Sequence, residues 1–177
     1  MLEGKNVNLR KAEKGDVSLV VEWWRNPQYM GDFQDVMTIS KAEMEKVMLE
    51  DTVFFIIEKK DGTKIGHIGG FMGGRTSLEI GYALVPSERG KGYGTEAIRI
   101  IVDYLFLKKN SVRIQAPAAT ENVASQKALE KAGFSKEGLM RKSGHAKGEY
   151  IDQYLYSILR EEWKEPKVLT KTQQVPK

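Results

Sequence analysis

The sequence predicts a single α/β (α+β) domain, and three observations lead to that prediction. The chain has 177 residues, which is the usual size of one domain and enough to bury a core. Residues 78–107 have the pattern of a strand, a glycine-rich turn and a long helix in immediate succession. Hydrophobic residues make up 41% of the chain and charged residues 29%, as in folded globular proteins. Strands and helices are therefore expected to share one core.

Taken in order, the other elements follow from hydrophobic periodicity and from capping residues. The expected strands are residues 6–10, 53–58, 64–71, 78–85, 112–116, 134–140 and 150–159. Helices are expected after the capping residues Asp16, Ser40 and Asn122, and from about Thr95. Ser40 and Glu43 have the spacing of a capping box.

The remaining segments are expected to be irregular. Residues 28–39 have no clean period, so we expect a loop or a short helix there. Residues 141–149 are polar and are expected to form a loop between the last two strands. We expect one domain over residues 1–163 and a flexible tail over residues 164–177.

The turn at residues 89–94, with the sequence RGKGYG, is the most informative part of the chain. Gly90, Gly92 and Gly94 let the backbone approach a ligand without clashes from Cβ atoms. The N–H groups of the first turn of the following helix then face that ligand, and the helix dipole favours negative charge. Arg89 and Lys91 add positive charge. We therefore predict a pyrophosphate site, the alternative being an ordinary glycine-rich connection before a helix.

Several classes of site are excluded or disfavoured. The turn has neither the GxxxxGK[ST] pattern of a P-loop nor the spacing of GxGxxG. The chain has no cysteine, which rules out disulfides, thiolate zinc sites and a cysteine nucleophile. We expect no metal site, and we expect neither His67 nor His145 to be catalytic. A net charge of +4 is too small and dispersed to indicate nucleic-acid binding, but it suits an anionic ligand.

Two motifs in the expected order resemble those of the GNAT N-acetyltransferases. Arg89, Gly92 and Gly94 match the coenzyme A signature Gln/Arg-x-x-Gly-x-Gly/Ala of that family. Asn122, followed by Gly133 and Phe134, is similar to its second hallmark. The sequences EIGY, RGKGYGTEA and GEYIDQYLYSIL further resemble the RimJ/RimL-like subgroup, which acetylates ribosomal-protein N-termini. The resemblance extends from residue 7 to residue 163.

The resemblance implies a mixed, mostly antiparallel sheet that is splayed at its centre and flanked by helices. Acetyl-CoA would be the co-substrate, without a metal, and a backbone N–H near Leu84 or Val85 would polarise the thioester carbonyl. The residues expected to bind the cofactor are Leu84, Val85, Arg89, Gly90, Lys91, Gly92, Tyr93, Gly94, Thr95 and Asn122.

Two residues are candidates for catalysis. Many GNAT enzymes have a tyrosine four residues before the Gly-Phe pair as the general acid, but this sequence has Leu129 there. In RimL-type enzymes a serine three residues after the asparagine is assigned that role, so the resemblance points to Ser125. Glu79 is the candidate general base, because it lies in the strand that leads to the turn. The alternatives are an ordinary helical serine and a solvated or ion-paired glutamate.

The implied reaction is attack of a primary amine on the thioester of acetyl-CoA. Deprotonating a lysine-like amine at pH 7 costs about 4.6 kcal/mol, whereas an α-amine costs only about 1–1.4 kcal/mol, so a weak base suits a protein N-terminus. One rival is a polyamine or aminoglycoside as acceptor, with acidic side chains at its site. The carboxylates considered for this are Asp32, Asp35, Glu79 and Glu121. A rival of another class is a non-catalytic acyl-CoA-binding sensor.

The expected surroundings follow from the absence of other signals. The sequence contains no run of 18 apolar residues and no apolar stretch near its start, so we expect no membrane segment, no secretory signal and a cytoplasmic location. We expect an amine substrate, no nucleic-acid partner, and a monomer or a homodimer.

Overall fold

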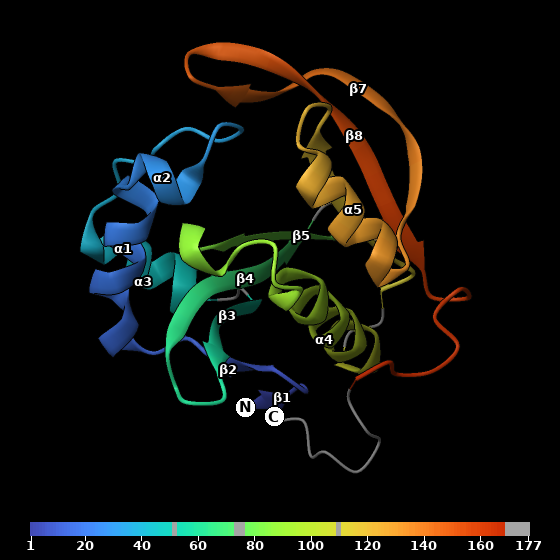
Figure 1. The fold of residues 1–177 in the computed structure, drawn as a ribbon, viewed down its shortest axis with the longest axis horizontal. Helices are drawn as coiled ribbons and strands as arrows, with labels where there is room; N and C mark the ends of the chain where they lie inside the picture. Colours follow the sequence, from blue (N-terminus) through green and yellow to red (C-terminus); the bar gives the residue numbers. More distant parts are fainter. Residues whose placement is uncertain (51–52, 73–76, 109–110, 169–177) are drawn as a thin grey trace.

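The structure, a computed structural model, describes residues 1–50, 53–72, 77–108 and 111–168. Its eight strands form one mixed sheet in the order β1-β2-β3-β4-β5-β6-β8-β7 (Figure 1). The strands are β1 (Leu2–Glu3), β2 (Val7–Lys11), β3 (Val53–Lys59), β4 (Lys64–Met72), β5 (Ser77–Leu84), β6 (Arg113–Ala119), β7 (Ser135–Ala146) and β8 (Glu149–Leu159). The helices are α1 (Val17–Arg25), α2 (Pro27–Met30), α3 (Lys41–Leu49), α4 (Tyr93–Lys108) and α5 (Val123–Ala132). All pairings are antiparallel except β5 with β6, which confirms the predicted fold class.

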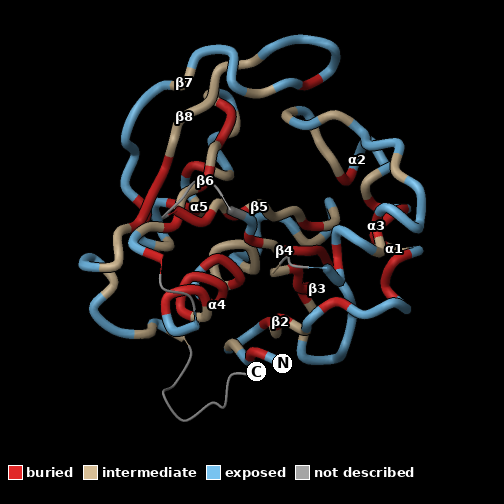
Figure 2. Tube along the Cα trace, turned by 180° about the vertical axis from the view of Figure 1, so that it is seen from behind, coloured by how far each residue is buried: buried red, intermediate tan, exposed pale blue. Residues whose placement is uncertain are grey.

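Helices cover both faces of the sheet, and alternation along the strands divides the core between them. In β3, Phe55 and Ile57 belong to the hydrophobic cluster that contains α4, while Phe54 and Ile56 belong to the cluster that contains α1 and α3. Figure 2 shows buried residues concentrated in α4 and in the central strands. The continuous apolar run of β3 is thus explained by burial on both faces.

The centre of the sheet is splayed, as expected. The parallel ladder between β5 and β6 has three residue pairs, beginning at Ser77 with Arg113 and ending at Glu79 with Gln115. Beyond that point β5 continues to Leu84 without a further pair to β6. The carboxyl-terminal half of β5 therefore presents one edge to the opening between the strands.

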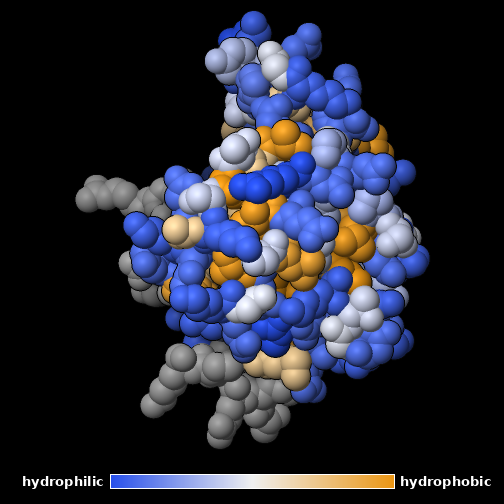
Figure 3. Space-filling model, turned by 90° about the vertical axis from the view of Figure 1, so that its left-hand side faces the viewer, coloured by the Kyte–Doolittle hydropathy of each residue, from blue (hydrophilic) through white to orange (hydrophobic). Residues whose placement is uncertain are grey.

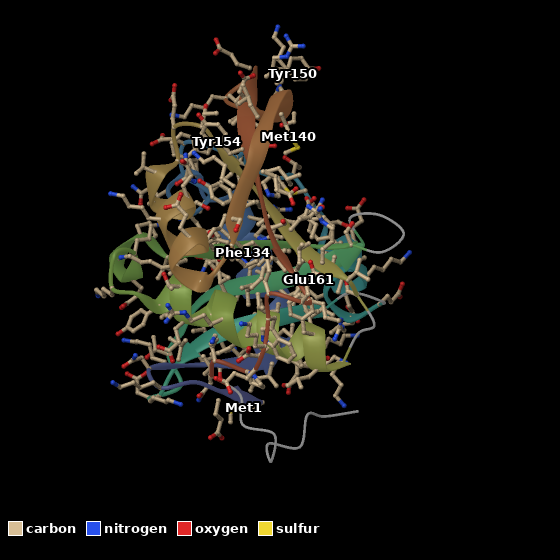
Figure 4. The ribbon with its side chains drawn as sticks, turned by 90° about the vertical axis from the view of Figure 1, so that its right-hand side faces the viewer. Met1, Phe134, Met140, Tyr150, Tyr154 and Glu161 are labelled. Carbon is tan, nitrogen blue, oxygen red and sulfur yellow. The ribbon has the colours of Figure 1, made fainter. Side chains whose placement is uncertain are left out.

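The segment predicted as a loop at residues 141–149 is mostly strand. β7 continues to Ala146, and Lys147 and Gly148 form a two-residue turn with φ values of +53° and +80°. Two successive positive φ values are typical of a type I′ hairpin turn, which matches the twist of the paired strands. The polar sequence was misleading because most of this hairpin is exposed, so no apolar alternation marks it. Figure 4 shows the hairpin projecting from the sheet, with Tyr150 near its tip and Met1 at the far end of the molecule.

The segment after β8 returns to α4. The Asp103 carboxylate in α4 is fully buried and accepts hydrogen bonds from Trp163 Nε1, from Lys167 N and from Val168 N. These contacts attach residues 163–168 to the domain, including the first part of the predicted tail. Residues 169–177 lie outside the described residues.

Candidate active site

The glycine turn (residues 89–94) joins β5 to α4 through a short 3₁₀ turn at Pro86–Glu88. Gly90 and Gly92 have φ values of +74° and +87°, a conformation that other residues adopt only with strain. A Cβ built on either glycine meets no atom within 4 Å, so both face open space. α4 starts at Tyr93, and the N–H groups of its first turn lie next to that space. The geometry fits an anionic group bound by backbone N–H groups.

A hollow of about 680 Å³ lies beside the glycine turn. It includes Gly92 and Thr95, the residues 3–6 at the start of the chain, and residues from the end of α5 and from the segment after β8. Its cationic side chains are Lys5, Lys91, Arg99, Lys131 and Lys167. Its carboxylates are Glu3 and Glu96, and Glu96 accepts hydrogen bonds from Asn6 and from the backbone of Val7. Five positive and two negative groups make this hollow suitable for a polyanionic ligand.

The two basic side chains of the turn have protein partners. Arg89 Nε donates to the Leu84 carbonyl at 3.0 Å, and Nη2 donates to the carbonyls of Gln28 and Tyr29 at 3.0 and 2.6 Å. Lys91 Nζ pairs with Glu88 at 3.0 Å. The guanidinium of Arg89 therefore joins α2 to the end of β5.

Main-chain groups of β5 divide between its two edges. Val85 N donates to the Ile65 carbonyl at 2.8 Å, so Val85 faces β4. In an antiparallel ladder this direction alternates, and Leu84 and Tyr82 therefore direct their N–H groups away from β4, toward the side where β6 has diverged. Of the two donors predicted for a thioester carbonyl, Leu84 is the one that faces the opening, because the N–H of Val85 is already used.

Glu79 lies at the last residue pair before the strands diverge. Its carboxylate accepts a hydrogen bond from Gln115 Nε2 at 2.9 Å. Glu79 alternates with Leu78 and Ile80, which belong to the cluster around α4, so its side chain emerges on the opposite face of the sheet. The predicted base is thus half-buried at the splay and is held by a neutral partner.

Ser125 lies in the first turn of α5, on the other side of the splay. Asn122 caps this helix, because its Oδ1 accepts from Ser125 N at 3.1 Å. The Ser125 hydroxyl is hydrogen-bonded to the Tyr82 hydroxyl at 2.7 Å. Burial raises the pKa of Tyr82 to about 12, although the hydrogen bond to Ser125 opposes this effect. The phenol is therefore a protonated donor near neutral pH.

Tyr82 was not among the residues predicted for the site. Leu129 is completely buried in the core, so α5 provides no phenol at the position where many GNAT enzymes have one. Tyr82 instead brings a phenol from β5 to the start of the same helix. A signal was present in the sequence, since Tyr82 is the one polar member of the inward series that also contains Leu78, Ile80 and Leu84.

An aromatic group lies under α1 and α2, on the face opposite α4. His67 of β4 stacks on Phe54 with a centroid distance of 5.2 Å, and its Nδ1 is 2.8 Å from the Tyr29 hydroxyl. Burial lowers the pKa of His67 to about 4, so the ring is neutral at pH 7. The Tyr29 hydroxyl also lies 3.2 Å from the Ala83 carbonyl of β5. These contacts attach α2 to the central strands.

The tip of the β7–β8 hairpin reaches the loop between α2 and α3. Asp35 interacts with His145 and accepts a hydrogen bond from Lys147 N at 2.7 Å, while Lys147 Nζ pairs with Asp32 at 2.6 Å. We call these four side chains the hairpin contact. Figure 3 shows this side of the molecule, with hydrophobic side chains between hydrophilic ones below the projecting hairpin. The exposed hydrophobic residues of the loop include Val36 and Met37.

Two other properties concern the described residues only. None of their helices is long and apolar enough to cross a membrane. In the same residues, no group of three or more His, Cys, Asp or Glu side chains is arranged to hold a metal ion.

The chain is similar to known acetyltransferases in sequence and in fold. A family model described as "Acetyltransferase (GNAT) domain" matches residues 6–135. The uncharacterized N-acetyltransferase p20 of Bacillus licheniformis is 36% identical over 175 residues, which cover 90% of this chain and 96% of p20. The ribosomal-protein-S5-alanine acetyltransferase of Vibrio fischeri has a TM-score of 0.79 at 22% identity, with 92% of this chain and 98% of that one covered. The spermidine N-acetyltransferase of Vibrio cholerae, solved with CoA and spermine, has a TM-score of 0.78 at 24% identity, with 90% and 99% covered.

Proposed function

Because the chain belongs to the GNAT acetyltransferase family, with acetyl-CoA as its co-substrate, we propose that it acetylates the α-amine of a protein N-terminus. Three features support acetyl-CoA binding: the positive φ values of Gly90 and Gly92, the start of α4, and the basic hollow beside them. Backbone N–H groups of the turn would bind the pyrophosphate, and the cationic side chains of the hollow would meet the remaining negative charge.

The observation that carries the choice of acceptor is that most of the candidate carboxylates already have protein partners. A polyamine site needs acidic side chains that are available to several ammonium groups. Of the four carboxylates considered for such a site, three have partners in the same chain: Asp32 and Asp35 pair with Lys147 and His145, and Glu79 accepts a hydrogen bond from Gln115. A polyamine would have to compete with these partners, whereas a peptide N-terminus presents a single amine. The structural neighbours include both a ribosomal-protein acetyltransferase and a spermidine acetyltransferase, so the fold does not decide between them.

The chemistry of the acceptor agrees with this choice. Glu79 is the carboxylate at the splay, and it accepts a hydrogen bond from the neutral amide of Gln115. Carboxylates are weak bases. Neutralising an α-amine at pH 7 costs about 1–1.4 kcal/mol, against about 4.6 kcal/mol for a lysine side chain. A weak base is therefore sufficient to deprotonate an α-amine and is poorly matched to a lysine side chain.

In the proposed reaction, Glu79 acts from β5 and Ser125 acts from α5, on the two sides of the splay. Glu79 accepts the proton that the attacking amine loses, directly or through a water molecule. The Leu84 N–H donates a hydrogen bond to the carbonyl oxygen as negative charge develops, which is worth roughly 3–4 kcal/mol for such donors. Ser125 donates its hydroxyl proton to the leaving sulfur.

The test is thiol release from acetyl-CoA with a panel of amines. The panel contains a peptide with a free N-terminus, the same peptide with a blocked N-terminus and an internal lysine, spermidine and an aminoglycoside. Turnover confined to the free N-terminus is the expected result. Turnover of spermidine or the aminoglycoside would move the acceptor to small molecules, and acetyl-CoA binding without any turnover would favour a sensor.

A further inference from the structure

The hydroxyl pair formed by Tyr82 and Ser125 connects the two halves of the sheet at the splay. Tyr82 extends from β5, and Ser125 belongs to α5, which connects β6 to β7 in the other half of the sheet. The two hydroxyl oxygens are 2.7 Å apart, whereas the Ser125 carbonyl is 3.4 Å from the same phenol. The shorter contact is the stronger hydrogen bond, and either hydroxyl group has a proton that it can donate in it.

The direction of this hydrogen bond follows from acidity. A phenol, with an ordinary pKa near 10, is a stronger acid than an aliphatic alcohol and is the better donor of the two. When Tyr82 donates to Oγ, the Ser125 proton is free to point elsewhere. The edge of β5 next to this pair carries the main-chain groups of Tyr82 and Leu84, which are directed toward the opening.

We propose that Tyr82 is a positioning residue that orients the Ser125 hydroxyl toward the leaving sulfur and replaces the proton that Ser125 gives up. The inference rests on the proposed function and deepens it. This role would explain how a chain with Leu129 in place of the usual tyrosine still has a phenol next to Ser125. Leu129 itself is fully buried in the core.

In the proposed step, the amine nitrogen bonds to the acetyl carbon, and the carbon–sulfur bond breaks with both electrons going to sulfur. Ser125 Oγ gives its proton to sulfur and receives the Tyr82 phenol proton, and the proton lost by the amine goes to Glu79. Before the next turnover, Glu79 releases its proton to solvent and Tyr82 regains one from solvent. Burial, which raises the pKa of Tyr82 to about 12, keeps the phenol protonated in the resting enzyme.

The test compares Tyr82→Phe, Ser125→Ala and the double variant, because phenylalanine keeps the partly buried ring and removes only the hydroxyl. We expect Tyr82→Phe to lower kcat about 10-fold with an unchanged KM for acetyl-CoA, and Ser125→Ala to lower kcat about 100-fold, within the range of general acid catalysis. In the Ser125→Ala background, Tyr82→Phe should change kcat less than 2-fold, since its effect passes through Ser125. Ser125→Thr, which keeps a hydroxyl, should recover most of the activity.

The matched control is Tyr156→Phe. Tyr156 is a fully buried tyrosine whose hydroxyl, like that of the partly buried Tyr82, reaches α5. It donates there to Glu130 at 3.1 Å and does not contact Ser125. This variant should unfold at lower denaturant and keep the wild-type kcat. A Tyr82→Phe variant with wild-type kcat, or with an undiminished 10-fold effect in the Ser125→Ala background, would overturn the inference.

The assay uses whichever amine of the panel the wild-type protein acetylates. Departure of the thiolate is common to all acceptors, so turnover of spermidine would overturn the proposed acceptor while the Tyr82 comparison still stands. Absence of thiol release with every amine and with water would overturn both proposals.

Discussion

Position 92 needs a residue without a Cβ for two separable reasons. The backbone there has a φ of +87°, and the space in front of it is open for a ligand. An L-residue in the left-handed region costs roughly 1–2 kcal/mol. We expect Gly92→Asp to lose about that much stability and, in addition, to weaken acetyl-CoA binding at least 10-fold, because its carboxylate would face the pyrophosphate. Calorimetric titration with acetyl-CoA and urea unfolding measure the two effects.

Gly62 supplies the control for backbone strain. It lies in the turn between β3 and β4 with a φ of +84°, and a Cβ built on it also meets no atom within 4 Å. Gly62→Asp should lose similar stability and keep wild-type affinity for acetyl-CoA. Equal losses of affinity in the two variants would mean that the glycine turn is only a connection.

His67 is expected to make stability depend on pH. Its pKa is lowered by burial from 6.5 to about 4, so the unfolded chain takes up the proton first as the pH falls. The stability present above pH 6.5 is therefore lost as the pH falls toward 4. Between pH 7 and pH 5 the loss should be about 2 kcal/mol, and His67→Gln should remove most of it. Urea unfolding at the two pH values measures the difference.

The second histidine is the control for this window. His145 has an exposed side chain on the hairpin, so His145→Gln removes the other histidine of the chain without changing the core around His67. Asp16, whose pKa lies at about 2 because its hydrogen bonds from Arg10 and Lys64 outweigh its desolvation, titrates well below the window. A slope that survives His67→Gln would show that another group causes it.

At the level of single residues, the sequence was informative where function depends on local backbone geometry. Gly90 and Gly92 could be recognised because a positive φ selects glycine from the chain itself. Tyr82, the partner of Ser125, could not be recognised in this way, because it is 43 residues away and meets Ser125 only when β5 and α5 are placed together. Gln115, the partner of Glu79, was missed for the same reason.

Between elements, Arg89 has a role that its place in the motif does not reveal. Its guanidinium holds three backbone carbonyls, one at the end of β5 and two in α2. Hydrogen bonds from a charged donor are worth about 1.5–3 kcal/mol when sheltered, and less when exposed as here. We expect Arg89→Gln to cost about 1–2 kcal/mol in urea unfolding and to raise amide exchange in α2.

Lys91 is the natural comparison for Arg89. It is exposed and pairs with Glu88, so Lys91→Gln should change stability by less than about 0.5 kcal/mol. If both variants lost the same stability, removal of positive charge rather than of the α2 contacts would be the cause.

Element boundaries were predictable where capping and apolar periodicity coincide. The capping box of Ser40 and Glu43 and the cap at Asn122 are both formed. The β7–β8 hairpin was shortened in the prediction because its outer half has few buried residues to mark a period. The burial of Asp103 in α4 was not predictable, because the segment that covers it returns from about 60 residues further along the chain.

At the scale of the whole molecule, the sheet consists of two parts joined weakly at its centre. β1 to β5 form one part, β6 to β8 form the other, and the ladder between them has three residue pairs. Other links across the splay are the hydroxyl pair, Gln115 with Glu79, and the hairpin contact. No local pattern encodes such links, since each joins segments far apart in the chain. These three links are polar, and the hydrophobic core around α4 includes residues of both parts.

The hairpin contact is expected to restrain the tip of the β7–β8 hairpin. Hydrogen bonding to His145 is the main cause that lowers the pKa of Asp35, with a further contribution from the Lys147 N–H. The Asp35 carboxylate is therefore charged at neutral pH. The contact is lost only as the pH falls below the ordinary pKa of an aspartate side chain. We expect Asp35→Asn to speed exchange of the Lys147 amide several-fold at pH 7, because that amide donates directly to Asp35. It should also raise KM for the acceptor and leave KM for acetyl-CoA unchanged, since Asp35 itself contacts the hairpin residues His145 and Lys147.

Asp152 provides a control within the same hairpin. Its carboxylate accepts a hydrogen bond from Lys142 N at 2.8 Å, so Asp152→Asn should alter exchange at Lys142 and leave the Lys147 amide protected. If Asp35→Asn left the Lys147 amide as protected as in the wild type, the tip would be held by its own strand pairing, and the acceptor side would be open. If instead acetyl-CoA and acceptor KM rose together, the hairpin would be restraining both halves of the sheet rather than the acceptor side alone.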